Sequence, residues 1–225
     1  MQSSPEGTPR QIVIALFDRF AALDAVGPHQ VLTKLSGAEV IFASERGRDV
    51  TDESRTLTLQ PQASYADVPR PDIILIPGGP GQAVQMAVGP LQDWLAEADK
   101  TSTWTTSVCT GALVLAAAGL LTGRKATTHW LAQQELRRLG AIPQQGERYV
   151  FDGKYVTAAG VSAGIDMALA LAARIVGDEG AQIIQLGIEY DPQPPFQSGS
   201  PATAKPEIVE YLTARSRFAA HSQRS

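Results

Sequence analysis

Three short runs of apolar, mostly branched residues constrain the fold of this chain more than any other feature. They are residues 11–17 (QIVIALF), 38–44 (AEVIFAS) and 72–77 (DIILIP). Runs of this length are typical of strands that are buried on both faces. Helical spacing follows the first run at about residues 25–35 and occurs again at residues 91–100. Strands that alternate with helices predict right-handed βαβ units, and therefore an α/β fold with a mainly parallel sheet covered on both faces.

The second half of the chain continues this alternation. A strand over residues 104–108 leads directly into Cys109 and an apolar, interior helix over residues 110–121. Short strands are expected at residues 126–128, 148–151 and 155–158, the last two joined by an Asp-Gly turn of the hairpin type. A helix is then expected over residues 165–176, with Ser162 as its candidate cap.

The length of 225 residues predicts a single domain. We expect a disordered tail over residues 1–10, the α/β domain over residues 11–205, and an exposed C-terminal helix and tail over residues 206–225.

The bulk composition excludes several kinds of partner. The net charge is −4 and the charged residues are scattered, so no basic stripe is present that would bind nucleic acid. The longest apolar stretch, residues 112–121, is shorter than the roughly 20 residues of a membrane helix. The first ten residues lack the apolar core of a signal peptide, so we expect a cytoplasmic protein.

The single cysteine, Cys109, lies where a buried strand turns into a buried helix (SVCTG), which is the setting of a nucleophile elbow. There the positive end of the helix dipole and unpaired N–H groups favour the thiolate, so we expect a lowered pKa for Cys109. The alternative is that Cys109 is a small buried hydrophobic residue, the commoner fate of a free cysteine. The local pattern leaves both interpretations open.

The glycine-rich residues 78–81 (GGPG) follow a strand but do not match a dinucleotide-binding loop. The third glycine of a dinucleotide-binding loop would fall at position 84, where this chain has Val84. Pro80 also removes one of the N–H groups that would face a phosphate. The backbone amides of Gly78 and Gly79 are therefore candidate hydrogen-bond donors beside Cys109, of the kind that stabilises developing negative charge in an oxyanion hole. A tight turn with no catalytic role would also need these glycines.

Asp24 and His129 are further candidates. Asp24 follows the first strand at the start of a helix, where it serves either as an N-cap or as an acid. His129 is either a partner for a cysteine or a structural histidine. The three histidines and the acidic residues show no metal-ligand spacing, so we expect no metal and no other cofactor.

Taken together, four segments resemble the ThiJ/PfpI superfamily, which is related to the class I glutamine amidotransferases. They are the IPGG loop, the VCTGA elbow, and the ATTHW and LDAVGP segments. Members with protease-like activity carry a histidine directly after the cysteine, whereas this chain has Thr110, and the glutamate of many relatives is replaced by Asp24. With the blocks GVSAGIDMALALAA and IEYDPQPPFQSGSP, these features resemble the isocyanide hydratases over about residues 11–202.

The resemblance implies a flavodoxin-like three-layer sandwich, a homodimer and a small-molecule isocyanide as substrate. It also implies that Cys109 is the nucleophile, Asp24 the essential acid and Thr110 a hydroxyl required for activity, without a cofactor. Asp24 packed against a thiolate in an apolar pocket should then have a raised pKa.

Two other functional classes stay open at this stage. One is a glyoxalase-like or other carbonyl-directed cysteine enzyme of the same superfamily, since one fold hosts many reactions. The other is a non-enzymatic sensor of a ligand or of redox state, although the absence of a second cysteine removes any internal resolving partner.

Overall fold

A seven-stranded sheet forms the centre of the protein in this computed structural model, which describes residues 10–219. The strand order is β10-β11-β7-β6-β1-β2-β5. All neighbouring strands are parallel except β10 and β11, which form an antiparallel hairpin at one edge. The expected mainly parallel sheet is therefore confirmed, and so is the Asp-Gly hairpin. The strands of the sheet are β1 (Arg10–Ala15), β2 (Ala38–Ser44), β5 (Ala63–Ser64), β6 (Ile73–Ile76), β7 (Trp104–Val108), β10 (Tyr149–Asp152) and β11 (Tyr155–Ala158).

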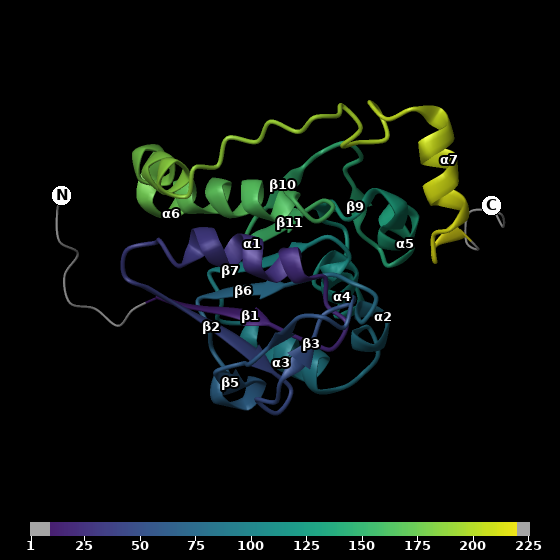
Figure 1. Cartoon of the computed structure of the whole chain (residues 1–225). Helices are drawn as coiled ribbons and strands as arrows, with labels where there is room; N and C mark the ends of the chain where they lie inside the picture. The colour runs from purple at the N-terminus through teal and green to yellow at the C-terminus, as the bar shows by residue number, and fades with distance from the viewer. Residues whose placement is uncertain (1–9, 220–225) are drawn as a thin grey trace.

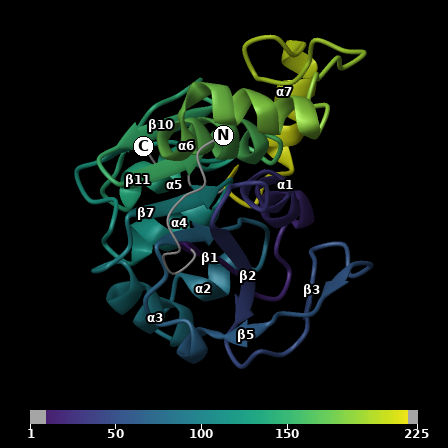
Figure 2. The same cartoon turned by 90° about the vertical axis from the view of Figure 1, so that its left-hand side faces the viewer.

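Helices cover both faces of the sheet, which gives the three layers of a flavodoxin-like sandwich. Helices α1 (Ala22–Leu32) and α6 (Ala163–Gly187) pack against each other above the sheet in Figure 1, and α3 (Pro90–Ala98) lies below it. The same division is visible from the side in Figure 2. The strands of the centre are apolar because they face helices on both sides, and all four residues of β6 are fully buried.

Smaller elements complete the chain. They are two short two-stranded sheets, β3 (Val50–Thr51) with β4 (Thr58–Leu59) and β8 (Lys125–Ala126) with β9 (Ile142–Pro143), the turns η1 (Tyr65–Asp67) and η2 (Trp130–Ala132), and the helices α2 (Gln82–Gln85), α4 (Gly111–Ala117), α5 (Gln133–Arg138) and α7 (Pro206–Ala214). Helix α7 begins at the predicted Pro206 and lies beside α5 in Figure 1. The predicted N-terminal tail, apart from Arg10, and residues 220–225 lie outside the described residues.

Helices α4 and α6 differ from the predicted helices at their C-terminal ends, and α1 (Ala22–Leu32) and α3 (Pro90–Ala98) are shifted by one to three residues. Helix α4 ends at Ala117, not at residue 121, because Gly119 adopts φ = 77°. The Gly119 and Leu120 amides then bond back to the Ala116 and Leu115 carbonyls, which is a Schellman C-cap. Helix α6 continues to Gly187 beyond a break at Gly177, and the Ser162 hydroxyl makes no capping bond to its first turn.

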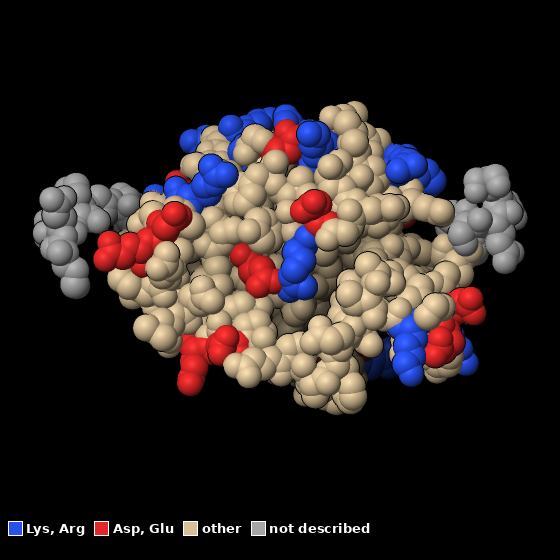
Figure 3. Space-filling model, turned by 90° about the horizontal axis from the view of Figure 1, so that it is seen from above, with Lys and Arg blue, Asp and Glu red and all other residues tan. Residues whose placement is uncertain are grey.

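Charges of both signs are interspersed on the face shown in Figure 3, which carries no extended basic patch. Among the described residues, none of the helices is both long and apolar enough to span a membrane.

Candidate active site

Three adjacent strands deliver the candidate residues to one edge of the sheet. Strand β1 is followed by the loop that leads to Asp24, β6 by Gly78, and β7 directly by Cys109. The order β7-β6-β1 makes these strands neighbours, and parallel strands end at the same edge. The prediction that these segments meet at one rim is confirmed.

Cys109 occupies a backbone conformation that few side chains adopt. Its φ is 55°, in the left-handed region that is uncommon for residues other than glycine. The turn also needs Gly111, since a Cβ there would lie 2.2 Å from the Ile76 carbonyl oxygen. The Cys109 amide donates to two carbonyl oxygens at the end of β11, those of Ala158 at 3.1 Å and Ala159 at 2.9 Å. The strained turn is thus fixed from both sides, as expected for a nucleophile elbow.

Asp24 does not cap a helix. Helix α1 begins three residues earlier than the predicted helix and Ala21 takes the N-cap position, so Asp24 lies in the first turn of α1. Its carboxyl group is fully buried and turns toward the sheet edge, where Oδ2 accepts a hydrogen bond from the Gly78 amide at 2.8 Å. Oδ1 is buried without an N–H or O–H donor among the described residues. The N-cap interpretation is therefore wrong, and the carboxyl group is left available for another role.

The surroundings of Asp24 favour its neutral form. Burial raises the pKa of Asp24 to about 7, and the hydrogen bonds from the Gly78 amide and from Cys109 oppose this only in part. The negative charge of Glu53 adds to the rise of this pKa. The expected raised pKa of Asp24 is confirmed, and it places the titration of this carboxyl near neutral pH.

The expectation of a lowered pKa for Cys109 is wrong. Burial raises the pKa of the Cys109 thiol, and the negative charge of Asp24 raises it further. The Thr110 and Val161 amides and the Thr110 hydroxyl all hydrogen-bond the sulfur and lower its pKa, but less strongly than burial raises it. The resting site therefore favours the thiol, and the thiol and the carboxyl group share their protons as a coupled pair.

Gly78 and Gly79 position side chains in this structure. The Gly78 amide donates to Asp24, and the Gly79 amide donates to the Thr110 hydroxyl at 3.1 Å. A Cβ at Gly78 would lie 2.7 Å from Thr110 Oγ1 and 2.9 Å from Asp24 Oδ2, so only glycine allows this approach. Their predicted role as donors to the substrate stays a prediction, since both amides are already engaged.

Two residues at the site were not identified from the sequence. The Val161 amide reaches Cys109 because β11 pairs with β7 and the chain turns back after Ala158. Arg217, from the segment after α7, donates to the Gly79 carbonyl at 3.2 Å and to Gln82 Oε1 at 2.6 Å. The GVSAG block, which contains Val161, could have indicated that residue, but nothing in the sequence around Arg217 indicates that Arg217 lies at the site.

His129 has a local structural role. Its Nδ1 accepts a hydrogen bond from the Leu131 amide at 3.3 Å and so caps η2. Burial lowers the pKa of His129, and the positive charge of Arg217 lowers it further. Because His129 is neutral and its Nδ1 caps η2, the structure supports the structural interpretation of His129 over pairing with Cys109. The described residues contain no group of three or more side chains placed to hold a metal ion.

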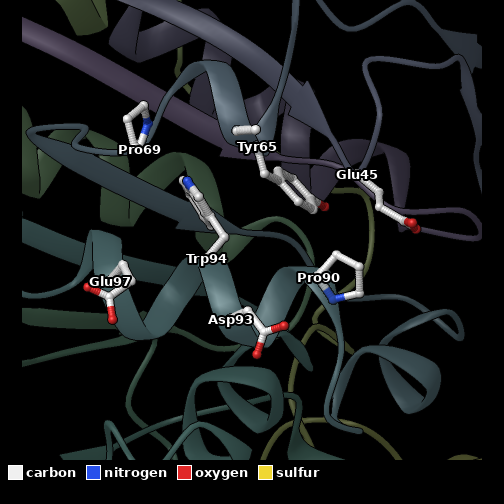
Figure 4. Close-up of a pocket in the computed structure, with 8 residues that line it drawn as sticks. Glu45, Tyr65, Pro69, Pro90, Asp93, Trp94 and Glu97 are labelled. Atoms are coloured by element: carbon white, nitrogen blue, oxygen red, sulfur yellow. The ribbon is translucent and has the colours of Figure 1, made fainter.

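A hollow of about 310 Å³ lies away from this site, beside α3. Figure 4 shows its lining, in which Tyr65 and Trp94 stack with their ring centroids 5.3 Å apart. Both polar atoms are used, since Tyr65 donates to the Leu16 carbonyl and Trp94 to the Val68 carbonyl. The hollow is therefore a seam where η1 packs on α3, and neither Cys109 nor Asp24 lines it.

The fold and the site define a class: a three-layer α/β protein with a cysteine at a strand-to-helix elbow and a buried carboxyl group beside it. The model of the DJ-1/PfpI family matches residues 10–174, and this chain belongs to that family.

The most informative relatives agree with this assignment. The chain is 44% identical over 205 residues to an isonitrile hydratase from Pseudomonas putida, covering 91% of this chain and 89% of the relative. A ThiJ/PfpI family protein from Pseudomonas syringae superposes with a TM-score of 0.88 at 33% identity, covering 94% and 89% of the two chains. DJ-1beta of Drosophila melanogaster superposes with a TM-score of 0.75 at 21% identity, covering 82% of this chain and 100% of that one, which is a likeness of fold.

Proposed function

We propose that this protein is a cofactor-independent isocyanide hydratase, which adds water to an isocyanide to give an N-substituted formamide. One observation carries the proposal: the only thiol of the chain lies beside a buried carboxyl group whose pKa is about 7. The identity of 44% to an isonitrile hydratase over most of both chains supports the choice of substrate class.

The reaction needs a soft nucleophile and a proton at the same carbon atom. The isocyanide carbon accepts a nucleophile only as it becomes protonated, so a thiolate and a nearby acid must act together. The Cys109–Asp24 pair supplies both the nucleophile and the proton when the thiol and the carboxyl group hold one proton between them, which we call the one-proton form. Because the pKa of the thiol is raised, Asp24 first takes the thiol proton and then delivers it to the isocyanide carbon.

The atoms balance over two steps. In the first, a carbon–sulfur bond forms to Cys109 and the former thiol proton becomes the carbon-bound hydrogen of a thioimidate. In the second, water adds across the carbon–nitrogen double bond, placing its hydroxyl on carbon and a proton on nitrogen. Collapse of this adduct forms the formamide carbonyl, breaks the carbon–sulfur bond and returns the proton to the Cys109–Asp24 pair.

Thr110 and the Val161 amide stabilise the sulfur as charge develops on it. Both groups hydrogen-bond Cys109 in the resting site, so no reorganisation is needed when the thiol loses its proton. Gly78 and Gly79 hold Asp24 and Thr110 in place, and their amides are candidates for substrate contacts if those bonds are exchanged during turnover.

Incubation with a simple alkyl or aryl isocyanide tests the proposal directly. We expect the native protein to form the formamide, and Cys109→Ser to fold normally but form none, because a hydroxyl is a far weaker nucleophile than a thiolate. Absence of formamide with the native protein and a range of isocyanides contradicts the proposal. Undiminished turnover by Cys109→Ser excludes Cys109 as the nucleophile.

We also propose that the protein is a cytoplasmic homodimer. A single free thiol stays reduced most readily in a reducing compartment, which supports the cytoplasm. Apolar side chains are exposed on the last part of α6 and on α7, including Ile183, Leu186 and Tyr211, which supports association with a second copy. Light scattering at micromolar concentration should give the mass of two chains, and a monomer mass would contradict the dimer.

A further inference from the structure

The segment after helix α7 returns to the edge of the sheet where Cys109 lies. Residues 188–205 cross the top of the molecule in Figure 1 and lead to α7, which lies on the same side as α2 and α4. Residues 215–219 then place the Arg217 guanidinium against the loop after β6 and the first residue after Cys109. A hollow of about 200 Å³ separates this segment from η2 and α5, with Phe218 on one wall and Trp130 on the other.

Arg217 has partners that fit its geometry. A single Nη2 donates to Gln82 Oε1 at 2.6 Å and to the Gly79 carbonyl at 3.2 Å, and it reaches Thr110 Oγ1 at 3.5 Å. Gln82 is itself buried, and its amide nitrogen is held by Met86 Sδ at 3.0 Å. The guanidinium carbon also lies 4.9 Å from the ring centroid of Phe218, so a cation–π contact within the same segment stabilises the charge of Arg217.

The contact with Thr110 decides where the Thr110 hydroxyl hydrogen points. A hydroxyl has two acceptor lone pairs and one hydrogen. The Gly79 amide occupies one lone pair and Arg217 approaches the other, which leaves the hydrogen free to point to Cys109. The hydrogen bond from Thr110 to the sulfur follows from this arrangement.

We propose that Arg217 is a positioning residue of the Cys109 site, which orients the Thr110 hydroxyl toward the sulfur and balances the negative charge of the Asp24–Cys109 pair. The charges around Arg217 fit this role. Burial lowers the pKa of Arg217, and Arg19 adds to this fall, whereas negative charge on Cys109 and on Glu53 opposes it and favours the charged guanidinium. Attraction between two groups is reciprocal, so the guanidinium favours the thiolate in return.

Alkylation of Cys109 by iodoacetamide over a range of pH tests the role of Arg217 without any isocyanide. In Arg217→Met we expect the midpoint of the pH profile to move to higher pH, and the rate near neutral pH to fall by about 10-fold, because a nearby opposite charge shifts a pKa by about a unit or more. The limiting rate at high pH reports access to the sulfur, so an opened site raises that limit but leaves the midpoint unchanged. Arg217→Lys keeps the charge but loses the planar fork, so its midpoint should stay near that of the native protein.

The matched control is Arg215→Met. Arg215 belongs to the same segment but stacks on Tyr211 of α7, 3.7 Å from the ring centroid. This variant should retain the native midpoint. Thermal unfolding of every variant shows whether the fold is retained, and a midpoint in Arg217→Met equal to that in Arg215→Met would overturn the inference.

Formamide turnover adds a second measurement, which rests on the proposed function. A positioning role predicts a lower kcat with little change in KM for Arg217→Met, with partial recovery in Arg217→Lys. Unchanged kcat in Arg217→Met also overturns the inference. If the native protein forms no formamide, the proposed function fails, while a shifted alkylation midpoint still supports the role of Arg217.

Discussion

Asp24 and Asp99 are two buried carboxyl groups at opposite edges of the same mainly parallel sheet, and their hydrogen-bond partners differ greatly. Asp99 precedes β7, where Thr105 donates to Oδ1 at 2.6 Å, Tyr155 donates to Oδ2 at 3.0 Å, and Lys154 pairs with Oδ2 at 3.1 Å. Asp24 lies beside the other end of β7, with the Gly78 amide on one oxygen and, within residues 10–219, no N–H or O–H donor on the other.

The two carboxyl groups differ in how completely the fold satisfies their oxygens. The partners of Asp99 satisfy both oxygens and join α3, β7 and β11, as expected where burial must not cost stability. Burial raises the pKa of Asp24 to about 7, and the hydrogen bonds that Asp24 accepts offset this rise only in part. A group that the fold leaves incompletely satisfied can gain and lose a proton at neutral pH, which is what an acid catalyst needs.

The largest expected effect comes from Asp24→Asn. Asparagine keeps the shape and an acceptor for the Gly78 amide but carries no transferable proton, so formamide turnover should fall by about 10²-fold or more. Because no helix cap is lost, the free energy of unfolding should be unchanged or increased. Formamide production and thermal unfolding on one sample measure both quantities, and normal turnover would contradict the catalytic role of Asp24.

The pH dependence of stability gives the next effect. The pKa of Asp24 rises from 3.8 in the unfolded chain to about 7 in the native protein, so between these values only the native state holds the proton. Stability is therefore greatest below this window and is lost as the pH rises through it, by a few kcal/mol at about 1.4 kcal/mol per pKa unit. Turnover should change in the opposite direction, because the one-proton pair forms as the pH passes about 7.

Urea unfolding at several pH values, with Asp24→Asn as the control, measures this linkage. The difference in free energy of unfolding between the variant and the native protein should increase in favour of the variant from acidic pH to above neutral pH. A constant difference would show that the pKa of Asp24 is not raised by folding.

The opposite pattern is expected for Asp99→Asn. The variant leaves Lys154 without its counter-charge and disturbs the bonds from Thr105 and Tyr155, so it should lose about 1–3 kcal/mol of stability. Turnover, measured well below the melting temperature, should stay close to that of the native protein because this cluster lies at the far end of β7. A large loss of turnover without a loss of stability would remove the contrast between the two carboxyl groups.

The sequence predicted those features of the fold and the site that follow from local patterns of residues. The bounds of β2, β7 and β11 are confirmed, since each coincides with a short run that the sequence marks as a strand. The meeting of Asp24 with Cys109 followed from the rule that parallel strands end at one edge. The pKa of Cys109 could not be predicted in the same way, because its direction depends on burial and on Asp24 outweighing local N–H groups.

Arg217 shows the other limit of sequence reasoning. It reaches the site through a long irregular connection and a helix whose residues are mostly exposed, so no periodicity or motif places it there. Its role depends on contacts with Gly79, Gln82 and Thr110, which lie more than a hundred residues away along the chain.

The smallest expected effect concerns Ser107, which lies in β7 two residues before Cys109. Its hydroxyl is fully buried and has no hydrogen-bond partner among the described residues. An unpartnered buried hydroxyl costs free energy, so Ser107→Ala should leave stability unchanged or raise it by up to about 1 kcal/mol. The neighbouring Thr106 is the matched control, because its hydroxyl donates to the Ile74 carbonyl at 2.8 Å and Thr106→Val should lose about 1 kcal/mol. If Ser107 is a structural exception with no part in proton transfer, Ser107→Ala keeps native turnover and its native pH profile. A fall in turnover of Ser107→Ala without a loss of stability would instead show that Ser107, like Asp24, takes part in the reaction. Both would then be buried polar groups at this edge of the sheet that the fold leaves incompletely hydrogen-bonded because the reaction uses them.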